Sequence, residues 1–94
     1  MLKDVVRLFL DDCPQLLNGI RGAVERGDAQ GMERAAHKLK GSVANFAAPA
    51  AYVAALRLEV MGRAGHLDQA TEALRQLESA LEELRPLLLN LVAA

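Results

Sequence analysis

Apolar residues recur every three or four positions along most of the chain, which is the spacing of one face of an α-helix. Gly27, Pro49, and Gly62 with Gly65 interrupt this pattern at positions where helices typically begin or end. Short connections between long amphipathic helices make successive helices adjacent and antiparallel. The pattern predicts an all-α fold for a single domain over residues 1–94: an up-down-up-down antiparallel four-helix bundle, with a short additional N-terminal helix or helical extension.

The first and last predicted helices each contain a proline, which removes one backbone hydrogen bond. A first apolar set is followed by a new helix start at Asp12, with Pro14 in its first turn, so the pattern allows either two helices or one helix bent at Pro14. The last helix is predicted to open at His66 and to kink or end early at Pro86. The apolar sets are Leu2, Val5, Val6, Phe9 and Leu10 in the first segment, and Leu67, Ala70, Leu74, Leu77, Leu81, Leu84, Leu88 and Leu91 in the last.

The leucine-rich face of the last helix has the spacing of a coiled-coil seam. Three other amphipathic helices need the same apolar surface, so we interpret it as part of the bundle core and expect a monomer.

The third predicted helix carries a carboxylate among its apolar residues. Tyr52, Ala55 and Leu56 lie on one side together with Glu59, and Leu58 widens this face. A carboxylate in an apolar face needs a hydrogen-bond donor or a position at the rim. Glu59 is remote in sequence from the second helix and no second acid accompanies it, so we expect a structural role.

The second predicted helix begins at an Asp28 cap, runs to about Phe46 and presents a histidine to solvent. At about 100° of turn per residue, His37 lies roughly 140–150° from the centre of the apolar stripe. The stripe consists of Met32, Ala35, Ala36, Leu39, Val43 and Phe46.

A glycine follows this histidine by one helical turn. Gly41 is unfavourable inside a helix by about 1 kcal/mol relative to alanine, but it leaves bare backbone beside the imidazole of His37. Lys38 and Lys40 add positive charge that suits an anionic group at the ring. The alternative interpretation is an amphipathic helix with a surface histidine and a tolerated glycine.

Composition excludes several other function classes. The net charge of −1 gives no general attraction to nucleic acid or to anionic membranes, and no run of 18 apolar residues or secretory signal is present, so we expect a cytoplasmic location. Cys13 is the one cysteine, which we interpret as a core residue. The chain has no glycine-rich phosphate loop, and its second histidine, His66, is interpreted as a turn residue, so we expect neither a metal site nor a cofactor.

The histidine segment resembles the signature of the histidine-containing phosphotransfer (HPt) family. The resemblance rests on Ala36-His37-Lys38-Leu39-Lys40-Gly41-Ser42 with Asn45-Phe46, and on flanking residues Phe9, Pro14, Gly27-Asp28, Leu58-Glu59 and Gly62-Arg63. Ala47 departs from the family pattern, which often has glycine there, and this leaves the end of the helix open.

The resemblance implies that His37 accepts a phosphoryl group from a receiver-domain aspartate and passes it to another receiver. It implies a phosphocarrier without catalytic machinery of its own, in which Lys40, and to a lesser extent Lys38, offsets the phosphate charge. Gly41 and Ala44 would leave room for the partner. The implied partners are receiver domains and a hybrid sensor histidine kinase, in the same or another chain, which includes the case of a domain of a membrane-anchored sensor.

Two alternatives stay open. The chain is also compatible with the phospho-accepting domain of a chemotaxis-type histidine kinase, which a kinase domain would label with ATP. It is also compatible with a helical interaction module that is not phosphorylated. Labelling of His37 by a phosphorylated receiver separates the phosphorelay function from both.

Overall fold

The computed structural model describes residues 2–93, and within this range the chain is helical with no strand. It forms α1 (Leu2–Arg26), α2 (Ala29–Val43), α3 (Pro49–Ala64) and α4 (Ala70–Ala93). This confirms the predicted all-α class with four helices. Met1 and Ala94, the ends of the predicted domain, and the side chain of Leu2 lie outside the described part.

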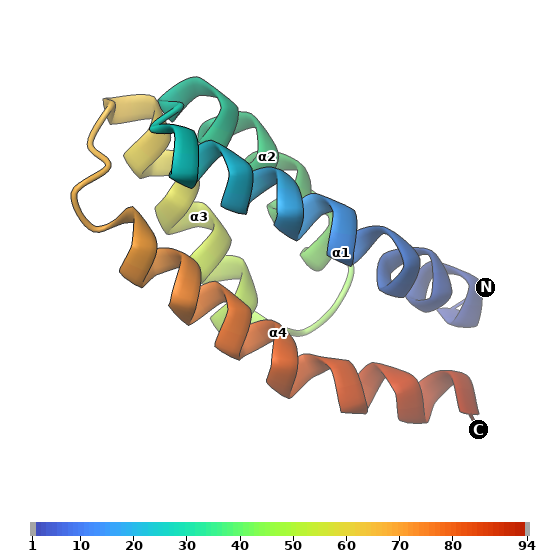
Figure 1. The fold of residues 1–94 in the computed structure, drawn as a ribbon. Helices are drawn as coiled ribbons and strands as arrows, with labels where there is room; N and C mark the ends of the chain where they lie inside the picture. The colour runs from blue at the N-terminus through green and yellow to red at the C-terminus, as the bar shows by residue number, and fades with distance from the viewer. Residues whose placement is uncertain (1, 94) are drawn as a thin grey trace.

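The four helices form a ring of neighbours around one hydrophobic core. α1 packs on α2, α2 on α3, α3 on α4, and α4 returns to α1. Figure 1 shows the chain turning back at each connection, with both of its ends at the same end of the molecule. The buried apolar residues from all four helices make a single cluster, whose largest fully buried members are Ile20, Met32, Leu39, Leu58, Leu77, Val6 and Val43.

Both helix-internal prolines lie within continuous helices. Pro14 is inside α1, so residues 2–26 form one helix and the predicted additional N-terminal helix is the first half of α1. Pro86 is inside α4, which continues to Ala93, so the early end predicted at Pro86 is wrong. Both prolines are solvent-exposed, and water can satisfy the carbonyl that each one leaves without its helical partner.

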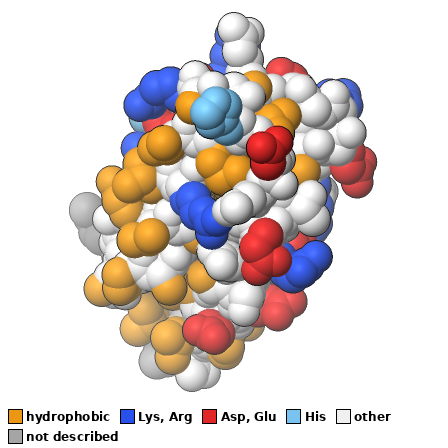
Figure 2. Space-filling view, turned by 90° about the vertical axis from the view of Figure 1, so that its left-hand side faces the viewer, with side chains coloured by type: hydrophobic (Ala, Val, Ile, Leu, Met, Phe, Trp, Pro, Cys, Tyr) orange, Lys and Arg blue, Asp and Glu red, His pale blue; other side chains and the backbone are white. Residues whose placement is uncertain are grey.

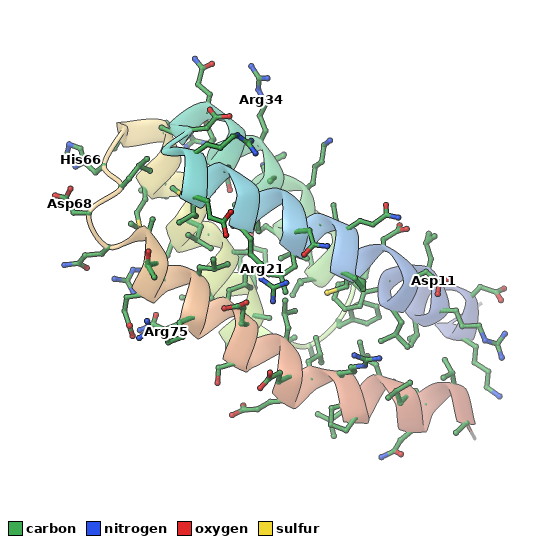
Figure 3. The ribbon with its side chains drawn as sticks, viewed as in Figure 1. Asp11, Arg21, Arg34, His66, Asp68 and Arg75 are labelled. Carbon is green, nitrogen blue, oxygen red and sulfur yellow. The ribbon has the colours of Figure 1, made fainter. Side chains whose placement is uncertain are left out.

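Two predicted helix boundaries differ from the structure, whereas the predicted end of α3 at Gly65 agrees with it. α2 ends at Val43 rather than near Phe46, and turns carry the chain on until Pro49 starts α3. α4 begins at Ala70, while His66 lies in the connection before it, as expected for a turn residue (Figure 3). Gly65, with a φ of 72°, ends α3 in the left-handed conformation that glycine adopts most easily.

The face that the third helix buries matches the predicted one only in part: Ala55, Leu58 and Glu59 are buried as expected, but Tyr52 and Leu56 are not. Tyr52 and Leu56 are each 37% exposed, whereas Ala51, Ala54, Ala55 and Leu58 are buried. Small alanines let α3 approach α2 closely, and Gly62, in the last turn of α3, also lies at their contact. A Cβ on Gly62 would lie 2.6 Å from the carbonyl oxygen of Ala29.

Candidate functional site

The candidate site begins with the exposed imidazole on α2. Asp28 caps this helix, because its Oδ1 accepts a hydrogen bond of 3.0 Å from the backbone N–H of Gly31. The apolar residues Met32, Ala36, Leu39 and Val43 point into the core. This orientation turns His37 outward, and its side chain is 67% exposed.

A buried carboxylate of α3 holds one nitrogen of this ring. His37 Nδ1 lies 2.8 Å from Oε2 of Glu59, whose side chain is 4% exposed. An ionised carboxylate only accepts hydrogen bonds, so this contact requires the proton on Nδ1. In the neutral ring the lone pair is then on Nε2, the nitrogen that faces away from Glu59. The contact therefore fixes both the orientation and the tautomer of the imidazole.

Two further cations surround Glu59. Lys40 Nζ lies 2.6 Å from Oε1, and Arg63 Nη2 lies 3.1 Å from Oε2. Oε1 makes no hydrogen bond of regular geometry within the described part of the chain, so it depends on the charge of the Lys40 ammonium. The contact with Lys40, followed by that with His37, holds the pKa of Glu59 below its ordinary value despite the opposing effect of burial. Glu59 is therefore a carboxylate at neutral pH.

Glu59 is the site residue that sequence reasoning missed. It stands 22 positions from His37, and only the packing of α3 on α2 brings the two side chains together. The expectation that Glu59 finds a donor is confirmed, but it finds several, and one of them is the imidazole. The available signal was its position at the edge of an apolar face, where an unpaired carboxylate would be costly.

The other predicted site residues lie on the same helix as His37. Lys40 is only 18% exposed, and its ammonium pairs with Glu59 instead of standing free beside the ring. Lys38 is exposed, and a Cβ on Gly41 would meet nothing within 4 Å. Ala44 is exposed at the end of α2. Their predicted roles toward a phosphate or a partner stay predictions.

Arg63 links the site to a second acid. Besides contacting Glu59, its Nε donates a hydrogen bond of 3.0 Å to Oε2 of Glu33 on α2. These acids, Glu33 foremost, raise the pKa of Arg63. The guanidinium side chain is 64% exposed and shares Glu59 Oε2 with His37, which places an exposed positive charge beside the ring.

A groove of about 610 Å³ lies between α1 and α4, away from His37. Arg21 reaches across it to Glu78 in an ion pair (Figure 3). Cys13 lines this groove and is half-buried, and burial raises the pKa of its thiol against the weaker opposing effect of Arg85. Within residues 2–93, no three His, Cys, Asp or Glu side chains form a group that could hold a metal ion, and no helix is long and apolar enough to span a membrane.

Comparison with known protein families matches the Hpt domain over residues 4–86. Comparisons with curated proteins and with solved structures gave no significant match. The matched range contains α2 and α3 in full, and with them the pair of His37 and Glu59. The chain therefore belongs to the Hpt domain family, whose members are phosphocarrier modules that transfer phosphoryl groups through a histidine in two-component phosphorelays and interact there with receiver domains and kinases.

Proposed function

We propose that His37 is the phosphoacceptor and that it takes its phosphoryl group from the aspartyl phosphate of a receiver domain and passes it to a second receiver. The observation that supports this most strongly is the 2.8 Å contact between Nδ1 and Glu59, because it leaves Nε2 as the outward-facing nucleophile on an exposed ring. Nothing else in the described chain combines exposure, a defined tautomer and a charged orienting group.

The transfer step follows from this geometry. Nε2 attacks phosphorus, the P–N bond forms as the P–O bond of the aspartyl phosphate breaks, and the receiver aspartate leaves as a carboxylate. The imidazole gains positive charge during this attack while it keeps its proton on Nδ1. Glu59, already ionised and 2.8 Å away, stabilises that charge without reorganisation. The reverse attack by another receiver aspartate restores the neutral ring.

The positive charges of the site have different roles in this proposal. The Lys40 ammonium is committed to Glu59 and keeps that carboxylate ionised. The Arg63 guanidinium is much more exposed than the Lys40 ammonium, so we assign to Arg63 the role toward the phosphoryl oxygens that the resemblance implies for Lys40. The receiver supplies the metal and the acids of the reaction, and this chain acts as the carrier.

The proposed function also agrees with the topology, location and oligomeric state expected from the sequence. An antiparallel up-down-up-down arrangement of the four helices presents α2 along its full length to a partner. A receiver partner places the chain in the cytoplasm, either free or next to a sensor kinase. We expect one copy of the chain to suffice, because both His37 and Glu59 come from the same chain.

The test is label transfer from purified phosphorylated receivers of the source organism. The variants His37→Gln and His66→Gln form a matched pair, since His66 is exposed in a connection and has none of the contacts of His37. We expect acid-labile label on the parent and on His66→Gln, and none on His37→Gln. Helical circular dichroism of all three proteins should agree, because exposed substitutions usually change stability by about 0.5 kcal/mol or less.

Two results would contradict the proposal. Labelling by a kinase domain with ATP, but by no receiver, would indicate the chemotaxis-type alternative. Absence of label from every receiver and every kinase would indicate a helical interaction module.

A further inference from the structure

The third helix is apolar on the side that faces solvent as well as on the side that faces the core. Four large hydrophobic residues of its outer face are 37–60% exposed: Tyr52, Val53, Leu56 and Val60, here called the α3 strip. A helix that is hydrophobic all round is normally covered on all sides. In Figure 2 hydrophobic side chains gather along the left and lower left of the view, with Lys or Arg side chains above them and most Asp and Glu side chains to their right.

The α3 strip borders the candidate site. At about 100° per residue, Tyr52 lies on the same side of α3 as Glu59, and Leu56, Val60 and Val53 follow it toward solvent. Tyr52 is seven residues before Glu59, a rise of about 10.5 Å along the helix. A partner of standard size covers about 800 Å² on each side, a disc of roughly 16 Å radius. Any protein that docks over His37 and Glu59 with such a footprint can reach the strip.

A shallow hollow joins the strip to the histidine helix. It measures about 310 Å³ at the turn between α2 and α3, and it is lined mainly by apolar residues that include Ala44, Phe46, Pro49, Tyr52 and Val53. Ala44 is two turns beyond His37 on the same face of α2. The surface therefore continues from the imidazole through Ala44 and the hollow to the strip. Apolar hollows of this kind receive the anchoring side chains of protein interfaces.

The other flank of His37 has a different character. By helical periodicity the exposed side chains Arg34 and Lys38 lie on the α1 side of α2, and the exposed Asn45 follows in the turn after the helix, so this flank is polar or charged. The centre of a protein interface is depleted in charged residues, while its rim is polar. A receiver centred on His37 would thus bury more apolar surface by extending over α3 than by extending over α1.

We infer that the receiver partner docks across α2 and α3, with the α3 strip as the main apolar part of its contact and one of its apolar side chains in the hollow. This inference rests on the proposed function. Arg63 and Arg57 flank the strip on its two sides, and within the described residues Arg57 donates hydrogen bonds to the neutral side chains of Gln69 and Gln76. The receiver surface that fits is therefore an apolar patch with an acidic rim.

Charge also argues against a second copy of the chain as the occupant. In a dimer with two-fold symmetry built on the α3 strip, each edge of one strip lies opposite either the same edge or the other edge of the second strip. Both arrangements place arginines of one copy opposite arginines of the other. Like charges across an interface are unfavourable, whereas an acidic receiver rim pairs with both arginines.

The test compares acidic substitutions inside and outside the strip. Val53→Glu and Val60→Glu change residues that are 60% and 50% exposed, and the matched control Leu8→Glu changes a residue of α1 that is 62% exposed. Each variant is labelled in two ways: by a phosphorylated receiver that labels the parent, and by phosphoramidate, a small donor that needs no docking surface. We expect both strip variants to lose at least tenfold in the receiver-dependent rate while Leu8→Glu and all phosphoramidate rates stay near the parent.

Each other outcome has a defined meaning. Receiver-dependent rates of the strip variants equal to the parent would overturn the docking inference and leave the proposed function standing. Failure of every receiver to label the parent would overturn the proposed function and this inference with it. A parent that sediments as a dimer, with Val60→Glu sedimenting as a monomer, would show that a second copy occupies the strip and would also overturn the inference.

Discussion

Replacing Glu59 by glutamine is the sharpest probe of the site, because it removes one charge and almost no volume. The carboxylate is 4% exposed and lies 2.6 Å from the Lys40 ammonium and 2.8 Å from His37 Nδ1. Glutamine leaves the Lys40 ammonium charged but places a neutral amide opposite it, so the charge–charge part of this partly buried contact is lost. Ion pairs at the protein surface contribute about 0.2–1 kcal/mol, and the greater burial here puts the loss at the upper end, about 1 kcal/mol. The contact with Arg63 adds little, since that side chain is 64% exposed and screened by water.

Urea unfolding followed by circular dichroism measures this loss of stability. In thermal unfolding, a loss of 1 kcal/mol at the midpoint would lower the Tm of a chain of this size by roughly 4–8 °C. The matched control is Glu33→Gln, which removes a carboxylate that pairs with the exposed Arg63 guanidinium. We expect the control to change the free energy of unfolding by less than about 0.5 kcal/mol. Equal stability of Glu59→Gln and the parent would refute the assignment of Lys40 as its main partner.

The dependence on pH separates a charge effect from a packing effect. The pKa of Glu59 is lowered in the folded state from an ordinary value of 4.5. Its carboxylate therefore stabilises the fold fully above the unfolded pKa, and this stabilisation is lost as the pH falls through the lower folded pKa. The difference in the free energy of unfolding between the parent and Glu59→Gln should be largest at neutral pH and should shrink in strong acid. A difference that stays constant across this range would mean that the variant disturbs packing.

The same variant tests the role of Glu59 in transfer. A glutamine amide presents either an acceptor oxygen or a donor nitrogen to Nδ1, so it no longer fixes the tautomer. It also cannot stabilise the positive charge of the attacking ring. We expect phosphoryl acceptance from a receiver to slow by about tenfold, which corresponds to 1.36 kcal/mol of barrier. A parent-like rate would make Glu59 a structural residue.

Three further predictions concern single positions. Gly41→Ala should raise the free energy of unfolding by up to about 1 kcal/mol, because a Cβ there meets open space, whereas Gly62→Ala should lower it by about 1–3 kcal/mol, because its Cβ would press on the backbone of Ala29. Thermal unfolding checks both, and equal effects of the two would contradict the packing described for α2 and α3. Gly41→Gln should keep the thermal stability but slow receiver-dependent transfer, since its side chain stands beside the imidazole, and a transfer rate equal to the parent would make this glycine incidental. Cys13 should react with an alkylating reagent at neutral pH more slowly than free cysteine, because burial raises the pKa of its thiol, and a rate equal to that of the free thiol would contradict its burial.

The sequence alone determined the helices and the outward direction of His37. Helical periodicity is local, so the apolar stripe of α2 places the imidazole on the solvent side whatever the neighbouring helices do. The Asp28 cap is also local, since it satisfies an N–H three residues away. The exact ends of α2 and α4 were not predicted, because turns at helix ends depend on what the following residues pack against.

The tertiary structure decided the rest of the site. Glu59 and Lys40 were both visible in the sequence, but their meeting depends on how α3 lies against α2. The face that α3 buries was predicted only in part, because a helix with few charged residues has no polar side to define its outside. Gly41 and Gly62 illustrate the same limit: both are glycines within helices, and only the distance to the neighbouring helix distinguishes open space from a close contact. Periodicity specifies which way a side chain points from its own helix, whereas its partners are specified by the packing of one helix on another.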